Sequence, residues 1–156
     1  PSEILNLDSE VTTKRAKELI NLVGLDGFED KYPHELSGGM KQRNSIIRAL
    51  IHDPSLLLMD EPFGALDAMT REQMNLELQR IWLESKKTVF FITHSIPEAV
   101  FLGDRIVVMT ARPGKIAEII PVDIPRPRDL KTMGDPEFVK LTQRIRGLLY
   151  AESTID

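Results

Sequence analysis

Short apolar segments alternate with longer helical patterns along this chain, and this alternation constrains its fold more than any other feature. The run Leu56–Met59 is too short and too uniformly apolar for an amphipathic helix, and Thr88–Thr93 is rich in β-branched and aromatic residues. Between them, residues 68–85 carry apolar side chains at helical spacing. We therefore predict two strands, each buried on both faces, in the mostly parallel sheet of an α/β protein.

Further elements are predicted on both sides of this unit. Helices are expected from about residue 8 to Val23, from Ser37 to just before Pro54, over Ile96–Leu102 and from about residue 135 onward. The turn pair Pro113-Gly114 separates two strand patterns, Ile106–Thr110 and Lys115–Pro121, which predicts a β-hairpin. We divide the chain into a helical piece at residues 1–36, an α/β core at 37–122 and a C-terminal extension with a helix at 123–156.

Composition argues against several classes of protein. The net charge of −4, without an evident basic patch, gives no reason to expect nucleic-acid binding. The chain has no cysteine, which excludes disulfides and thiolate metal sites. No apolar run approaches the roughly 20 residues that a helical membrane span needs. The chain opens without an initiator methionine, and we expect it to be cut from something longer.

The block Leu36–Arg43 has the properties of a phosphate-binding helix start. A helix N-terminus carries unpaired backbone N–H groups and the positive end of the helix dipole. Gly38 and Gly39 would let a phosphate approach without a Cβ atom in the way, Ser37 adds a hydroxyl, and Gln42 lies one turn further in. The alternative is an ordinary serine-capped helix with a pair of glycines.

Two carboxylates follow the first predicted strand directly. Ligands of open α/β sheets bind beyond the carboxyl ends of the strands, which is where Asp60 and Glu61 stand. Asp60 is suited to hold Mg²⁺ as a hard oxygen ligand, and Glu61 to polarise or orient an attacking water. Two solvated loop acids are the alternative interpretation.

Asp67 and His94 are two further candidates. Asp67 precedes a predicted helix, so its simplest role is that of an N-cap. His94 follows the second predicted strand, again at a carboxyl end, where it is placed to donate to a terminal phosphate. None of the histidines shares metal-ligand spacing with another, so no histidine metal site is expected.

Together these blocks resemble the C-terminal part of an ABC transporter nucleotide-binding subunit. The sequence LSGGMKQR resembles the signature motif, LLLMDEP the Walker B strand, GALD the D-loop and ITHS the segment with the switch histidine. The continuation Thr110–Ile116 resembles the importer ATPases of the nitrate, sulfonate and taurine group. The fold implied is P-loop-NTPase-like but incomplete, with part of an α-helical subdomain at its N-terminal side.

The resemblance implies an ATPase that uses ATP and Mg²⁺ and docks on a membrane permease, peripherally on the cytoplasmic face of the plasma membrane. Two subunits would sandwich two ATP molecules. Ser37, Gly38 and Gly39 would then contact ATP held by the partner, and Asp67 would lie in the D-loop that crosses the interface. Glu61 and His94 would act on ATP held by their own subunit, with Asp60 on the metal.

One motif of this family is absent from the sequence. A P-loop needs Gly-x-x-x-x-Gly-Lys-Ser/Thr. The nearest candidate, Gly114-Lys115, has Met109 in place of the first glycine and Ile116 in place of the Ser or Thr. We expect that roughly 40% of the parent subunit, on its N-terminal side, is missing. We also expect the chain to be inactive as an ATPase on its own, with an exposed sheet edge and exposed apolar surface.

Two other functions are compatible with the motifs. A non-transport ABC ATPase of chromosome maintenance or DNA repair would carry long coiled-coil insertions, and no sustained heptads occur upstream of the signature. A non-catalytic module would contribute only its signature motif to ATP held by a partner. The candidate catalytic residues Glu61 and His94 are both present in this chain, which argues mildly against such a module.

Overall fold

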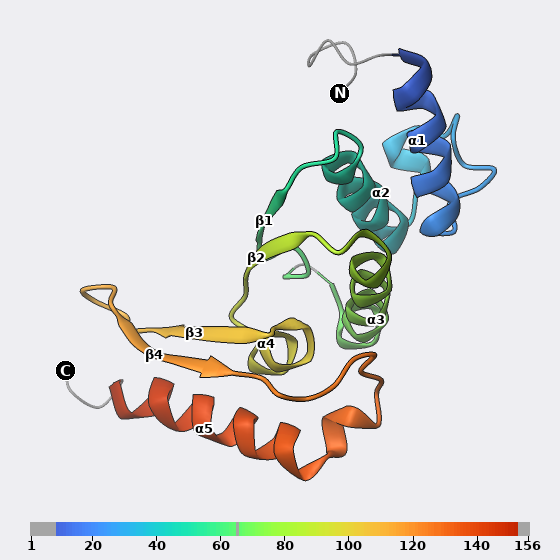
Figure 1. The fold of residues 1–156 in the computed structure, drawn as a ribbon. Helices are drawn as coiled ribbons and strands as arrows, with labels where there is room; N and C mark the ends of the chain where they lie inside the picture. Colours follow the sequence, from blue (N-terminus) through green and yellow to red (C-terminus); the bar gives the residue numbers. More distant parts are fainter. Residues whose placement is uncertain (1–8, 65, 153–156) are drawn as a thin grey trace. The chain divides into compact units, whose positions relative to one another are not determined.

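The computed structural model of the 156-residue chain describes residues 9–64 and 66–152 (Figure 1). The chain folds as two compact units, residues 1–92 and residues 93–156. The first contains α1 (Ser9–Leu22), the 3-10 helix η1 (Pro33–Glu35), α2 (Gly38–Leu50), β1 (Leu56–Asp60), α3 (Ala68–Ser85) and β2 (Thr88–Ile92). The second contains α4 (Ile96–Leu102), β3 (Arg105–Met109), β4 (Ile116–Pro121), the 3-10 helix η2 (Thr132–Gly134) and α5 (Pro136–Glu152).

Each predicted helix and strand is present, with bounds that differ by a few residues at most. The start of the first predicted helix, at about residue 8, lies outside the described residues, and α1 is described from Ser9. The predicted hairpin is confirmed, because β3 and β4 pair antiparallel with a register shift between Val108 and Met109. Within the described ranges, no helix is both long and apolar enough to cross a bilayer.

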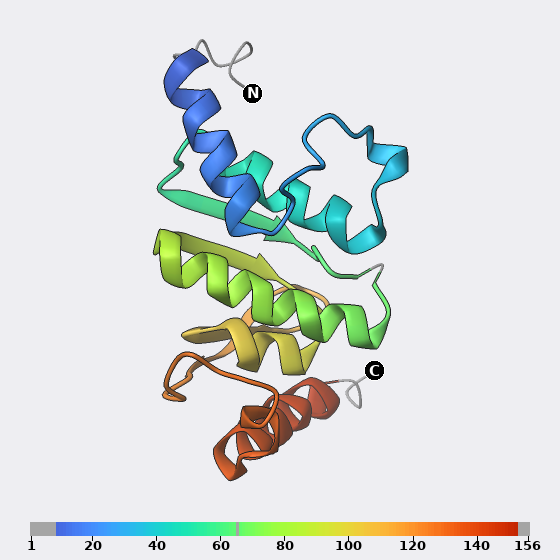
Figure 2. The same ribbon diagram turned by 90° about the vertical axis from the view of Figure 1, so that its right-hand side faces the viewer.

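In the first unit, β1 and β2 pair in parallel, with Leu56 opposite Thr88 and Asp60 opposite Ile92. One face of this pair carries the core, and Figure 2 shows α1 beside α2. The buried apolar residues of α2, β1 and α3 form this core: Ile46, Ile47, Leu50, Leu57, Met59, Met74, Leu78 and Ile81.

The prediction that both strands are buried on both faces is wrong for this structure. Burial alternates along β1, because successive side chains of a strand point to opposite faces and helices of this unit cover only one of them. Leu58 is 74% exposed and its register partner Phe90 is 57% exposed. The apolar side chains of β1 are therefore buried on one face of the strand only. The other face presents the exposed apolar surface that the sequence led us to expect.

In the second unit, α5 packs against both α4 and the hairpin strand β3. Because the strands alternate, each hairpin strand contributes only every second residue to this core. The buried apolar residues of the unit come from all four elements and the segment after β4: Val100, Phe101, Ile106, Val108, Ile120, Val122, Ile124, Phe138, Leu141 and Ile145.

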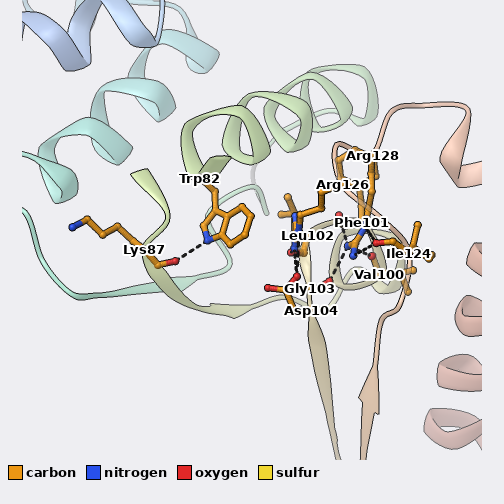
Figure 3. Close-up of polar contacts among 10 residues, drawn as sticks. All are labelled: Trp82, Lys87, Val100, Phe101, Leu102, Gly103, Asp104, Ile124, Arg126 and Arg128. Atoms are coloured by element: carbon orange, nitrogen blue, oxygen red, sulfur yellow. Dashed lines mark hydrogen bonds and ion pairs between the residues drawn. The ribbon is translucent and has the colours of Figure 1, made fainter. Parts of the chain in front are cut away.

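A buried arginine fastens the Pro-rich segment after β4 to the C-terminal end of α4 (Figure 3). Arg128 is only 2% exposed. Its guanidinium donates hydrogen bonds of 2.8–3.0 Å to four backbone carbonyl groups, those of Val100, Phe101, Gly103 and Ile124. The last carbonyls of a helix have no partner within the helix, and the helix dipole favours a cation there.

The same segment carries a second, more exposed arginine. Arg126 donates to the Asp104 carboxylate at 2.9 Å and to the Leu102 carbonyl.

Burial, with a smaller contribution from the charge of Arg126, lowers the pKa of Arg128 to about 10. Arg128 therefore stays charged at neutral pH.

We predict that Arg128→Met destabilises the chain by about 3 kcal/mol, because it leaves four carbonyl groups without their donor. Arg128→Lys should recover part of this loss, since an ammonium keeps the charge but not the fork of donors. Arg126→Met is the matched control and should cost less than Arg128→Met, because Arg126 is bonded to one carbonyl group and to the exposed Asp104 carboxylate rather than to four carbonyl groups. Urea unfolding followed by circular dichroism measures all three. Equal losses for Arg126→Met and Arg128→Met would contradict the role given to Arg128.

Candidate functional site

The N-terminal end of α2 is open to a ligand. Ser37 caps the helix, as predicted: its backbone is extended, and its Oγ accepts a hydrogen bond from the Met40 N–H (3.3 Å). Ser37 and Gly38 are exposed, and a Cβ atom added at Gly38 would meet nothing within 4 Å. No described neighbour therefore requires a glycine at position 38, and no described atom crowds the exposed start of α2 at this residue.

The start of α3 lies next to the start of α2 in the same unit. A Cβ atom at Gly39 would lie 3.9 Å from Cγ2 of Thr70, in the first turn of α3. Asp67 caps α3, accepting hydrogen bonds from the Thr70 N–H (3.0 Å) and the Thr70 hydroxyl (2.6 Å). The cap interpretation of Asp67 is thus confirmed. Two candidate blocks separated in the sequence, one at each helix start, share one surface.

The hydroxyl of Thr70, followed by its backbone N–H, lowers the pKa of the Asp67 carboxyl below its ordinary value. Asp67 therefore carries a negative charge at neutral pH at the positive end of α3. Ala65, in the middle of the GALD block, lies outside the described residues.

Asp60 and Glu61 lie at the shared carboxyl edge of β1 and β2, as the sequence predicted. Asp60 is the last residue of β1, and the Glu61 N–H donates to the Ile92 carbonyl at the end of β2 (2.9 Å). Glu61 has a φ of +43°, in the left-handed region that residues other than glycine seldom adopt. Both carboxylates are exposed. Their exposure beyond the strand end leaves both carboxylates accessible to a ligand.

The turn after Glu61 closes tightly on it. The Gly64 N–H donates to the Glu61 carbonyl (3.1 Å), and a Cβ atom at Gly64 would lie 3.4 Å from Oε2 of Glu61. A Cβ atom at position 64 would therefore be in ordinary van der Waals contact with the Glu61 side chain.

His94 belongs to the second unit and is exposed. It follows Ile92, the register partner of Asp60, by two residues in the chain, and Ser95 then caps α4. The loop residues Thr93 and Ser95 are bonded to Glu98 in α4, which the sequence analysis did not single out.

The candidate metal ligand on this surface is the Asp60 carboxylate at the end of β1. Within residues 9–64 and 66–152, no cluster of three or more His, Cys, Asp or Glu side chains is present to hold a metal ion. Mg²⁺ is usually held by one or two carboxylates together with phosphate oxygens of the substrate. Asp60, the last residue of β1, fits that pattern as a single exposed carboxylate.

Gln42 and Arg43 differ in their surroundings, although they are neighbours in α2. Gln42 is half-buried one turn beyond Gly39. Arg43 donates to the Val23 carbonyl (2.8 Å) just after α1, so it fastens α2 to α1. No sequence signal indicated this bond, because its two residues are twenty positions apart.

Comparison with known proteins gives consistent results. Residues 3–64 match the family model described as ABC transporter. An aliphatic sulfonates import ATP-binding protein of Bacillus cereus is 51% identical over 151 residues, 96% of this chain and 60% of that protein. A taurine import ATP-binding protein of Rhizobium johnstonii is 50% identical over 144 residues, 88% of this chain and 54% of that protein.

A solved structure resembles the fold as well. A dimeric ATP-binding cassette in a post-hydrolysis state, bound to ADP and Pi, is 33% identical with a TM-score of 0.57, over 76% of this chain and 50% of that one. This likeness confirms the predicted fold class, an incomplete P-loop-NTPase-like α/β fold. The chain spans about half to three-fifths of the length of the relatives it matches.

The lowered pKa of Asp67 predicts a pH dependence of stability. Because the pKa is lower in the folded chain than in the unfolded one, the cap's contribution is present above the ordinary pKa of 3.8 and is lost as the pH falls through the lowered value. Asp67→Asn keeps an acceptor for the Thr70 N–H but does not titrate. We expect the stability advantage of the wild type over Asp67→Asn to shrink between pH 5 and pH 2 in urea unfolding. An advantage that grows towards low pH would contradict this assignment.

Proposed function

The chain belongs to the ABC transporter ATP-binding family, and we propose that it acts within the ATP-binding subunit of an importer for a sulfonate, taurine or nitrate-like anion. The two importer relatives, each at least 50% identical, support the anion class. The observation that carries the proposal is the set of exposed polar groups at the shared carboxyl edge of β1 and β2 and at the neighbouring starts of α2 and α3.

In this proposal one surface of the chain contacts ATP held by a second subunit. Ser37, Gly38 and Gly39 would bind the terminal phosphate through a hydroxyl and free backbone N–H groups, with Gln42 one turn behind them. The open space in front of Gly38 supports this assignment. Asp67, whose helix starts beside Gly39, would lie in the same interface.

A second set of residues would act on ATP bound to the chain's own subunit. Asp60 would hold Mg²⁺, which neutralises charge on the phosphate oxygens when bound. Glu61 would accept a proton from the attacking water or orient it, and His94 would donate a hydrogen bond to the phosphate. The exposure of all three side chains supports their access to a nucleotide.

Further partners follow from the importer assignment. The complete subunit would dock on a transmembrane permease, peripherally on the cytoplasmic face of the plasma membrane, and drive uptake by ATP hydrolysis.

Taken alone, the chain would not turn over ATP, because its sequence has no Gly-x-x-x-x-Gly-Lys-Ser/Thr segment to cradle the phosphates. The same observation favours a second candidate, a non-catalytic module that lends its signature residues to a partner's ATP.

A chimera separates the two candidates. The 151 matched residues of the Bacillus cereus sulfonate protein would be replaced by those of this chain and assayed with the cognate permease. We predict ATP hydrolysis and sulfonate uptake by the chimera. Glu61→Gln should lower hydrolysis at least about 100-fold while ATP binding persists, because it removes the base.

Glu84→Gln, which neutralises an exposed acid of α3, is the matched control and should leave the rate unchanged. Rapid hydrolysis by the Glu61→Gln chimera would argue against the role of Glu61. A chimera that binds ATP and forms the dimer but never hydrolyses it would favour the non-catalytic module.

The place of Ser37 in the interface can be tested with the same chimera. Ser37→Arg adds bulk and charge at the proposed phosphate site. We therefore expect that the chimera carrying both Ser37→Arg and Glu61→Gln does not dimerise when ATP is added. Ser45→Arg is the matched control, because Ser45 is exposed about two turns further along the same helix. Light scattering with and without ATP measures the dimer. An ATP-driven dimer of the Ser37→Arg variant would refute this placement.

A further inference from the structure

The loop that carries His94 is tied to a buried acid in α4, and we propose that Glu98 is a positioning residue for His94, acting through Thr93. The part played by His94 in hydrolysis rests on the proposed function. The positioning itself rests on geometry within the second unit. Glu98 is only 4% exposed, whereas His94, four residues earlier, is exposed.

Three hydrogen bonds connect the loop to the helix. The Thr93 hydroxyl donates to Oε2 of Glu98 (2.7 Å) and accepts from the Ser95 N–H (2.9 Å). The Glu98 N–H in turn donates to Oγ of Ser95 (3.4 Å). The bonded groups therefore form one closed network around the start of α4.

This network departs from the usual capping box in a way that involves His94. In a capping box, the acid at the third helical position accepts directly from the backbone N–H of the cap residue. Here the Thr93 hydroxyl stands between the Ser95 N–H and the Glu98 carboxylate. Because Thr93 and Ser95 flank His94, their bond closes a small ring around the His94 backbone and fixes the direction from which its side chain leaves the chain.

The choice of an acid at this position needs an explanation. Burying a carboxylate is unfavourable unless its oxygens are hydrogen-bonded, so packing alone would favour an apolar residue of similar length. A charged acceptor also makes a shorter and stronger bond to a hydroxyl than a neutral one does. The carboxylate thus orients the Thr93 hydroxyl, which in turn holds its lone pair towards Ser95.

The other end of α4 is fixed independently. Arg128 donates to the carbonyls of Val100 and Phe101, two and three residues beyond Glu98. A short helix held at both ends gives Glu98 a fixed position from which to hold the His94 loop. The C-terminal extension therefore contributes to the placement of His94 through α4.

Hydrogen exchange of the full 156-residue chain tests the positioning without any ATPase activity. Thr93→Val and Glu98→Met preserve size but remove the bonded groups, so exchange of the Ser95 amide should rise at least about tenfold in both. Thr93→Ser keeps the hydroxyl and should stay close to the wild type. Unchanged Ser95 exchange in Thr93→Val and Glu98→Met would overturn the proposal.

Double-mutant kinetics in the sulfonate chimera test whether Glu98 acts through His94. We expect Glu98→Met to lower kcat about tenfold, with KM for ATP nearly unchanged, and to have no further effect when His94→Ala is already present. The same tenfold loss in both backgrounds would show a general structural effect and would overturn the positioning role. Full activity of His94→Ala alone would instead refute the proposed function of His94, while the exchange result would still decide whether Glu98 holds the loop.

Discussion

The parallel pairing of β1 with β2 determines where the candidate residues of the first unit lie. Because the strands run in the same direction and Asp60 is opposite Ile92, both carboxyl ends meet at one edge. The bond from the Glu61 N–H to the Ile92 carbonyl extends the pairing one residue beyond β1. That bond holds Glu61 in its left-handed conformation at the point where β2 leads into the His94 loop.

The helices that precede each strand carry the second group of candidates. Both begin with a capping side chain, Ser37 for α2 and Asp67 for α3, and Gly39 lies close to Thr70. A helix start concentrates unpaired N–H groups, so two neighbouring starts make a surface suited to an anion. At the start of α3 the Asp67 carboxylate accepts the Thr70 N–H and hydroxyl, whereas at the start of α2 Ser37 and Gly38 are exposed.

Features set by neighbours in the sequence could be predicted, and features set by distant partners could not. The caps at Ser37 and Asp67 depend on residues three positions away, and both were predicted correctly. The partner of Arg43 is distant, and nothing in the sequence indicated it. For β1 the pattern was interpreted correctly as a strand, but burial on both faces was wrong. An apolar run shows what a strand can bury, whereas the structure determines which face a helix covers.

The polar groups of the second unit divide into those that hold the backbone and those that remain accessible. Both Glu98 and Arg128 are buried. Glu98 is hydrogen-bonded at the start of α4, and Arg128 at its C-terminal end. His94 is exposed, with its flanking residues bonded to each other. A buried polar group that loses its hydrogen bonds is costly, so the bonds of Arg128 and of Glu98 each resist being broken. Because the backbone at His94 is already held in this way, it loses little conformational freedom when the side chain meets a ligand, which is the physical basis of preorganisation.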